Sequence, residues 1–271
     1  MSLVVYERVG HEGCRPSPFS WRVRYALAHK KLAAEFRPAR FTDVKTIRNL
    51  SGQKFVPILL DGETVVYDSW NIATYLEDRF PDHPSLFGGL AGRGVTRLVN
   101  HWADTTLHSP LRLLLFPDFI QCICPEDRDY FVRSREQEYG MTVEQVRREG
   151  ATWRTEFEVA CRPLEELLGQ QEFIGGYAAR YADYIVFSHF LRASLCGRRD
   201  VISPNSAIAF WQSRMISLFG GRLTESFVHA VVDRTAVGYP SALTSQSLTE
   251  ATNDRDVQRG DCTRQCRTIG A

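Results

Sequence analysis

Hydrophobic and polar positions alternate with two different periods along the first part of the chain. The apolar run LVVYE, residues 3–7, predicts a buried strand. PFSWRVRYALAHKKL, residues 18–32, has apolar side chains at the three-to-four-residue spacing of a helix, with Trp21 and Tyr25 on one face. AAEFRPARF, residues 33–41, predicts a second strand. The chain therefore begins with a strand, a helix and a strand.

The next segments continue this mixture of periods. Residues 44–50 predict a short helical piece. FVPILLDGETVVYD, residues 55–68, predicts two strands around Asp61-Gly62, a dipeptide that favours a tight hairpin turn. SWNIATYLEDRF, residues 69–80, predicts a helix that closes the unit. This order of elements predicts a compact α/β domain.

The pattern changes after a segment rich in proline and glycine, residues 81–94. From there to residue 219 the apolar spacing is helical only, whereas the last residues are polar and show no period. We also expect removal of the chain beyond about Tyr239 to leave folding intact, because it offers little apolar surface. The predicted organisation is an α/β domain over 1–83, a linker over 84–95, an all-α domain over 96–221 and a disordered tail over 222–271.

Charge and composition exclude several classes of partner. With 33 Lys and Arg against 32 Asp and Glu, the formal charge of +1 gives no field that would attract nucleic acid or an anionic membrane. No apolar run approaches the roughly 20 residues that span a bilayer, and no charged leader precedes the first strand, so we expect a cytoplasmic protein. The seven cysteines are scattered, which predicts reduced thiols and no metal site.

Candidate chemistry gathers at the start of the first helix, in GCRPSPFSWRVRYAL, residues 13–27. Ser17 followed by Pro18 is typical of a helix N-cap with proline at the first helical position. A helix N-terminus also presents unpaired N–H groups and about half a positive charge, which stabilise a thiolate held there. On the residues alone, a capping role and a catalytic role for Ser17 both stay open. Cys14 lies before the helix, and serines occupy the two sites of a dithiol, so disulfide chemistry is not expected.

Three motifs then occur in order: Ser17 at the first helix, Val56-Pro57 at the third strand and Asp68-Ser69 before the third helix. With these motifs the chain resembles the cytosolic glutathione transferases. The resemblance covers about residues 1–221 and implies a thioredoxin-like α/β domain followed by an all-helical domain. SWRVRYAL is similar to the zeta-class segment, whereas VVYDSWNIATYLEDRFPDHPSLF and PEDRDYFVRSREQEYGMT resemble bacterial β-etherases and related fungal serine-type transferases.

The resemblance implies how glutathione is activated and held. Ser17 matches the catalytic serine, whose hydroxyl would favour the thiolate of glutathione at neutral pH. Pro57 matches a cis proline, and the backbone of Val56 would pair with the cysteinyl unit of glutathione. Without the resemblance, Pro57 is an ordinary proline at the start of a strand.

The remaining glutathione contacts are implied in the same way. Ser69 suits the γ-glutamyl carboxylate and Asp68 suits the γ-glutamyl ammonium, although the pair alone is also a helix-capping signal. Lys54 and Arg40 are candidates for the glycyl carboxylate, although solvated surface charges explain them equally well. No metal or redox cofactor is implied.

In such proteins the helical domain supplies the wall of the electrophile site, and the family implies a homodimer. YADYIVFSHF resembles the buried folding helix of the family, with Arg180 where Ser or Thr usually caps it. The missing cap predicts a cost of about 0.5–2 kcal/mol, while Asp183 can still accept backbone N–H groups. The candidates for the electrophile pocket are Phe19, Trp102, Thr106 and Phe116.

The resemblance implies a glutathione-dependent enzyme that acts on a small, hydrophobic, aromatic electrophile by conjugation or by thiolate displacement at an aryl ether. Two alternatives stay open. One is glutathione-assisted cis-trans isomerisation, which the zeta-like segment favours, although Phe19 stands where that class has cysteine. The other is a non-catalytic protein that binds hydrophobic ligands, which the retention of Ser17, Pro57 and Asp68-Ser69 disfavours.

Overall fold

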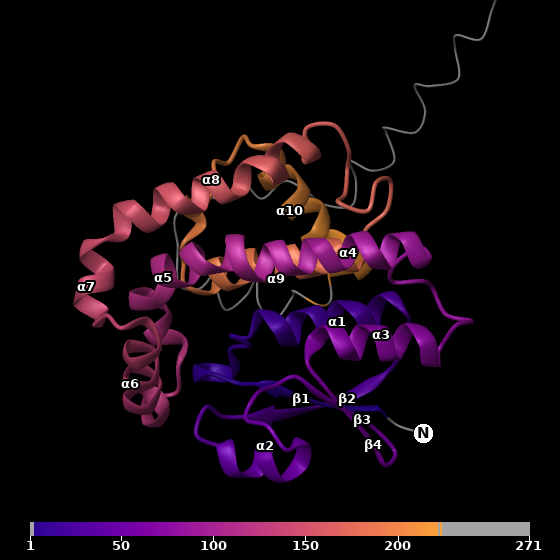
Figure 1. The fold of residues 1–271 in the computed structure, drawn as a ribbon, viewed down its shortest axis with the longest axis horizontal. Coiled ribbons are helices and arrows are strands. Elements are labelled where there is room, and N and C mark those ends of the chain that lie inside the picture. The colour runs from indigo at the N-terminus through magenta and orange to yellow at the C-terminus, as the bar shows by residue number, and fades with distance from the viewer. Residues whose placement is uncertain (1–2, 222, 224–271) are drawn as a thin grey trace, which may run out of the picture. The chain divides into compact units, whose positions relative to one another are not determined.

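The computed structural model of the chain describes residues 3–221 and residue 223, which belong to one compact unit. Apart from Leu223, the predicted disordered tail, together with the truncation site near Tyr239, lies outside the described residues. In the described part of the chain, no helix has both the length and the apolar character needed to cross a membrane. Figure 1 shows the arrangement of the elements.

The first half is built on a mixed four-stranded sheet with the strand order β2-β1-β3-β4. β1 pairs parallel with β2 and antiparallel with β3, and β3 pairs antiparallel with β4. The two-residue turn between β3 and β4 contains Gly62 at φ 60°, a left-handed conformation that glycine adopts without steric cost. The strands are β1 Leu3–Arg8, β2 Ala34–Ala39, β3 Ile58–Asp61 and β4 Thr64–Tyr67.

Helices cover both faces of this sheet. The helices are α1 Pro18–His29, α2 Val44–Ser51 and α3 Ser69–Arg79. In Figure 1, α1 and α3 lie between the sheet and the second half of the chain, and α2 lies on the opposite face of the sheet. This arrangement confirms the predicted thioredoxin-like α/β fold.

The second half is all-helical in the described residues, as the spacing predicts. α4 passes into α5 through a π-helical turn, Ala103–Leu107, so the long predicted helical stretch is one continuous run with a local irregularity. Residues 142–169 form two helices that meet at Glu149. The helices are α4 Leu90–Trp102, α5 His108–Phe119, α6 Arg128–Tyr139, α7 Val143–Arg148, α8 Gly150–Leu168, α9 Tyr181–Leu195 and α10 Ala207–Ser217.

The two halves share one hydrophobic core. Tyr25 of α1 packs against Tyr184 and Phe187 of α9, with ring centroids 5.2 and 5.7 Å apart. α4 begins at Leu90, which lies inside the segment predicted as a linker over 84–95. The limits of the two domains therefore stay a prediction, while the change from α/β to all-α structure lies between α3 and α4.

Asp183 organises the start of α9 as predicted. It is fully buried, and its carboxylate accepts the backbone N–H groups of Ile174, Gly175 and Arg180 at 2.7–3.1 Å and the Trp211 indole N–H at 3.0 Å. Arg180, in place of a capping Ser or Thr, instead donates to the carbonyl of Ser85 at 2.6 Å. The Asp183 carboxylate thus compensates for the missing hydroxyl cap.

Candidate active site

A cavity of about 820 Å³ lies where the N-terminus of α1 faces the helical half. From the first domain Ser17, Phe19, Lys54 and Val56 line it. From the helical half its lining residues include His108, Arg112, Phe119, Phe131, Tyr139 and Arg192. The cavity therefore combines a helix N-terminus with aromatic and cationic side chains.

Ser17 caps α1 as the sequence predicts. Its extended backbone, φ −87° and ψ 116°, places Oγ 3.2 Å from the backbone N–H of Ser20, which donates to it. Pro18 occupies the first helical position. Because Oγ uses a lone pair for the cap, its own O–H proton remains available for a ligand in the cavity. The capping and catalytic interpretations of Ser17 are therefore compatible.

Side chains of the first domain fix the segment that leads to Ser17. Glu7 at the end of β1 is 1% exposed and accepts from Arg15 at 2.7 Å and from Arg24 of α1 at 2.6 Å. Gly10 lies against the helical half, since a Cβ atom there would come within 2.1 Å of the Cys122 carbonyl oxygen. Cys14 is not among the residues that line the cavity.

Val56 and Pro57 have the geometry that the resemblance implies. The peptide bond between them is cis. Val56 lies before β3 on the cavity wall, and its backbone makes no hydrogen bond to any other described residue. Its peptide edge is thus available for an extended ligand.

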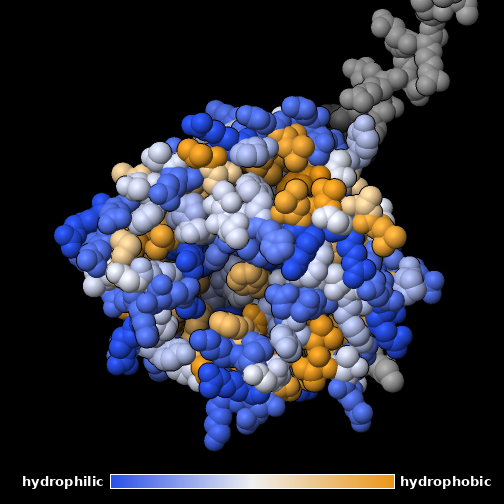
Figure 2. All heavy atoms as spheres, in the orientation of Figure 1, coloured by the Kyte–Doolittle hydropathy of each residue, from blue (hydrophilic) through white to orange (hydrophobic). Residues whose placement is uncertain are grey.

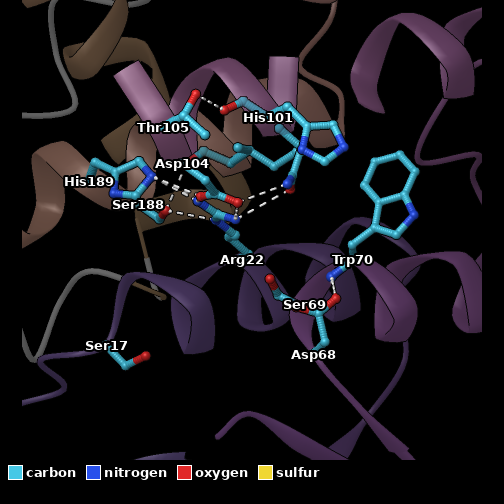
Figure 3. A network of polar contacts seen from close by, with 12 residues as sticks. Ser17, Arg22, Asp68, Ser69, Trp70, His101, Asp104, Thr105, Ser188 and His189 are labelled. Carbon is cyan, nitrogen blue, oxygen red and sulfur yellow. Dashed lines mark hydrogen bonds and ion pairs between the residues drawn. The ribbon is translucent and has the colours of Figure 1, made fainter. Parts of the chain in front are cut away.

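Asp68 and Ser69 begin α3. Asp68 has φ 72° and its carboxylate accepts the N–H groups of Trp70 and Asn71 at 3.0 and 3.1 Å. Ser69 is 2% exposed, and its hydroxyl has no hydrogen-bond partner among residues 3–221 and 223, whereas its carbonyl accepts the Tyr181 hydroxyl at 2.6 Å. Neither residue lines the cavity itself. Figure 3 shows the pair at the start of its helix, on the same side of the polar network as Ser17.

The two candidates for the glycyl carboxylate differ in position. Lys54 is exposed and lines the cavity. Arg40 does not line it, because its guanidinium is ion-paired with Asp127 at 3.0 Å and with Glu126 at 3.1 Å. Asp127 is fully buried and also accepts the Thr42 hydroxyl at 2.8 Å. Arg40 therefore joins the first domain to the start of α6 and is not placed to bind a ligand in the cavity.

Of the four candidates for the electrophile pocket, the structure brings only Phe19 to the cavity. Phe116 does not line the cavity, because it is 1% exposed and packs in the core against Phe131, with ring centroids 6.1 Å apart. Trp102 packs against the main core, and Thr106 faces solvent on the π-helical turn. Helical spacing shows which side chains share a face of one helix, but it does not show which of them line a cavity.

A buried polar network that the sequence does not predict is centred on Arg22 and Asp104 (Figure 3). Arg22 of α1 is fully buried and donates to Asp104 at 2.6 Å, with further contacts to Asn100, Ser188 and His189. Its guanidinium carbon lies 4.6 Å from the centre of the Phe19 ring. The network joins α1 to α4 and α9 and positions Phe19 on the wall of the cavity. The only signal in the sequence was an arginine on the apolar side of a helix.

Burial and neighbouring charges set the ionisation of this network. Burial lowers the pKa of His189 to about 4, against the attraction of Asp104, so the imidazole is neutral at pH 7. Burial alone would raise the pKa of Asp104, but the charge of Arg22 and its hydrogen bond to the carboxylate at 2.6 Å hold this pKa well below its ordinary value. The network therefore contains one cation, one anion and one neutral histidine.

A thioredoxin-like domain with a serine-capped helix and a cis-proline edge, joined to a helical domain, defines the fold and site of a glutathione transferase. Sequence profiles agree. The family described as glutathione S-transferase, N-terminal domain, matches residues 13–84, and that described as glutathione S-transferase, C-terminal domain, matches residues 94–225. The chain belongs to the glutathione S-transferase superfamily.

Curated relatives are similar over part of their length. A zeta-class glutathione S-transferase from Euphorbia esula is 32% identical over 119 residues, which are 41% of this chain and 52% of that protein. A glutathione S-transferase from Triticum aestivum is 37% identical over 79 residues, which are 29% of this chain and 37% of that protein. The chain thus spans about half or less of these relatives.

Solved structures of glutathione transferases are similar in fold over most of the chain. A glutathione transferase from Phanerochaete chrysosporium superposes with a TM-score of 0.64 at 23% identity, over 86% of this chain and 98% of that chain. A glutathione S-transferase from Ceriporiopsis subvermispora, solved in complex with glutathione, gives a TM-score of 0.65 at 17% identity, over 88% of this chain and 99% of that chain. At these identities the likeness establishes the fold.

Proposed function

We propose that the protein is a serine-type glutathione transferase that joins glutathione to a small electrophile with an aromatic or otherwise hydrophobic body. The observation that carries this proposal is the position of Ser17. It lies at the N-terminus of α1, on the wall of the cavity, with its hydroxyl proton free to be donated.

The chemistry follows from this position. A cysteine thiol has a pKa of about 8.5 in water, so only a small fraction of free glutathione is thiolate at neutral pH. A hydrogen bond from the Ser17 hydroxyl and the positive end of the α1 dipole both favour the thiolate. The thiolate then forms a carbon–sulfur bond with the electrophile, and a leaving group such as a halide or an aryloxide departs with the bonding electron pair.

The binding of glutathione is supported by three other features. The free backbone edge of Val56 suits the cysteinyl unit, and Ser69 and Asp68 suit the γ-glutamyl unit. Lys54, an exposed cation of the first domain on the cavity wall, suits the glycyl carboxylate. A relative of the same fold is solved in complex with glutathione. These features favour an enzyme over a protein that only binds hydrophobic ligands.

Calorimetry with glutathione and the full chain tests this proposal. We expect wild type to bind, and Ser69→Ala to weaken binding by about 1–3 kcal/mol through loss of a charged hydrogen bond. Thermal stability should hardly change, because the Ser69 hydroxyl has no partner among the described residues. Absence of binding to folded wild type would contradict the proposal.

Turnover of a panel of electrophiles separates the possible reactions. Aryl halides test conjugation, aryl ethers test the β-etherase-like reaction, and conjugated cis acids test isomerisation, each with and without glutathione. Release of the halide or phenol with consumption of glutathione indicates a transferase, whereas isomerisation leaves the glutathione concentration unchanged. If glutathione binds but no substrate reacts, the non-catalytic alternative is favoured.

We infer that a second copy of the chain packs on α4, as the family resemblance implies. Leu90, Val95 and Leu98 of α4 are 88%, 63% and 69% exposed. Figure 2 shows a mostly hydrophilic face with separate hydrophobic patches, including one in the region of α4 and α10. Burial of such side chains in a dimer is favourable by about 25 cal/mol per Å² of apolar surface.

A further inference from the structure

The cavity carries a clear excess of positive charge. Five cationic side chains line it, while among its described lining residues the one carboxylate is Glu138. Glu138 is already shared, because Arg112 and Arg135 both donate to it at 2.7 Å. The cations are Arg8, Lys54, Arg112, Arg135 and Arg192.

Arg192 of α9 is the one of these five cations that is buried with neither a hydrogen bond nor an ion pair to any residue that the structure describes. It is 9% exposed, it lines the cavity, and its guanidinium makes no hydrogen bond or ion pair with any residue in the described part of the chain. Its guanidinium carbon stacks 4.1 Å from the centre of the Phe119 ring. Burial lowers its pKa, but an arginine keeps its proton at pH 7.

Arg22 shows how this protein accommodates a buried guanidinium when no ligand is needed. Arg22 is fully buried, but Asp104 lies 2.6 Å from it, and Asn100 and Ser188 accept further hydrogen bonds from its guanidinium. A buried charge without such partners is costly in free energy. The contrast points to an anionic ligand as the partner of Arg192.

Other residues that line the cavity could contact the same ligand as Arg192. The Nδ1 atom of His108 and the Nε atom of Arg112 are also buried without a hydrogen-bond partner. Burial, together with the charge of Arg192, lowers the pKa of His108 well below its ordinary value, so its imidazole is neutral and can donate one hydrogen bond. Phe19, with its ring centroid 6.0 Å from that of His108, supplies an apolar wall.

This charge comes from a different part of the chain than the residues proposed for glutathione, although Ser17, Val56 and Lys54 line the same cavity. Ser17, Val56 and Lys54 belong to the first domain, whereas His108, Arg112 and Arg192 belong to α5 and α9 of the helical half. The two carboxylates of glutathione already have proposed partners in the first domain. The unpaired charge of the helical half is therefore available to the second substrate.

We propose that the electrophile is an organic acid with an aromatic or unsaturated body, whose carboxylate ion-pairs with Arg192 and whose body packs against Phe19 and Phe119. This inference rests on the proposed glutathione transferase function and narrows its substrate class from hydrophobic to anionic.

Binding of two matched, unreactive probes tests the inference without any turnover. The probes are 3-nitrobenzoate and its neutral analogue 3-nitrobenzamide, titrated calorimetrically into the full chain with S-methylglutathione present and absent. We expect wild type to bind the benzoate about 10-fold to 100-fold more tightly, as for a hydrogen-bonded charge pair. Equal affinity of wild type for both probes would overturn the inference.

Two variants test whether Arg192 is the residue that gives the preference for benzoate. Arg192→Gln should abolish the preference for benzoate and leave the affinity for glutathione within twofold of wild type. Arg135→Gln removes the same charge from the cavity wall, but from a side chain that already pairs with Glu138, so it should reduce the preference less than threefold. If both variants lose the preference for benzoate equally, the preference comes from the summed positive charge of the cavity and not from an ion pair with Arg192, which contradicts the inference. Loss of glutathione affinity in Arg192→Gln would place glutathione there instead, which also contradicts the inference.

Stability separates a ligand site from a structural role. Because Arg192 has no hydrogen bond or ion pair with the described residues to lose, and methionine can still pack on the Phe119 ring, Arg192→Met should melt at or above the temperature of wild type. A large loss of stability in Arg192→Met would assign the arginine to the fold. If wild type binds benzoate through Arg192 but does not bind glutathione, the proposed function fails while the anion site stands, so the two failures are distinguishable.

Discussion

At the scale of single residues, Ser17 combines two roles in one hydroxyl. Its lone pair accepts the Ser20 N–H at the start of α1, and its proton can be donated into the cavity. Ser206 performs the first role only. It caps α10 by accepting the Ala209 N–H at 3.1 Å, and it does not line the cavity.

The comparison of these two serines gives the first prediction. Ser17→Ala and Ser206→Ala should each lower the free energy of unfolding by about 0.5–2 kcal/mol through loss of a cap. Ser17→Ala should also lower kcat strongly and leave the glutathione affinity nearly unchanged, because the hydroxyl acts on the thiolate. Urea unfolding, calorimetry and steady-state kinetics on both variants measure this. Full activity of Ser17→Ala would rule out the serine mechanism, and Cys14→Ala is expected to have little effect.

His189 gives a prediction for pH. Its pKa is about 4 in the folded chain against 6.5 ordinarily, with Arg22, Asp104, His108 and Arg192 around it. Between these values the unfolded chain binds a proton that the folded chain does not, so the free energy of unfolding falls as the pH is lowered. This contribution amounts to about 2 kcal/mol lost between pH 7.5 and pH 5.

Urea unfolding at the two pH values, on wild type and variants, measures this contribution. His189→Gln should lose less stability than wild type over the same interval, because glutamine does not titrate. His101→Gln, the same substitution at an exposed position of α4, provides the control variant. If His189→Gln and His101→Gln show the same dependence as wild type, the assignment to His189 is wrong.

At the scale of elements, the start of α9 depends on one carboxylate. Asp183 accepts three backbone N–H groups and the Trp211 indole, all in a buried region. Helical period alone predicts α9, but the loop before it has no regular structure to supply those hydrogen bonds. The sequence of α9 itself thus predicts the helix, but contacts with the preceding loop and with α10 stabilise its start.

Asp183→Ala should lower the free energy of unfolding by at least about 3 kcal/mol, because several buried donors lose their acceptor at once. Asp118 provides a matched control. It is 39% exposed and pairs with Arg198 at 2.9 Å on the surface, so Asp118→Ala should cost less than about 1 kcal/mol. Urea midpoints of the two variants compare them directly, and similar losses would show that Asp183 is not the main support of α9.

At the scale of the whole molecule, α4 exposes apolar side chains that a second copy of the chain would cover. Leu98→Glu should therefore convert a dimer into a monomer, because it places a charge in the apolar contact. Val159→Glu, at a 49% exposed position of α8, should leave the assembly unchanged. Size-exclusion chromatography with light scattering gives both masses. A wild-type chain that is monomeric at micromolar concentration would contradict the proposed dimer.

Much of the fold follows from local sequence patterns. Period-two and period-3.6 spacing, the Asp61-Gly62 turn and the Ser17-Pro18 cap predict the order of strands and helices, because each depends on neighbours within a few residues. The start of α4 at Leu90 has no side-chain cap to mark it in the sequence. Family motifs, and not periodicity, predicted the cis bond at Pro57.

The sequence by itself therefore determined the class of fold and the candidate roles of Ser17, Val56 and Ser69. Only the tertiary structure decided which side chains reach the cavity, because contacts such as that of Arg22 with Asp104 join residues 82 positions apart. Phe116 and Arg192 illustrate the reason. Both lie on helices with apolar spacing, yet one is enclosed by core side chains and the other faces a cavity without an acidic partner. Burial and charge pairing depend on elements packed from distant parts of the chain, which no local pattern specifies.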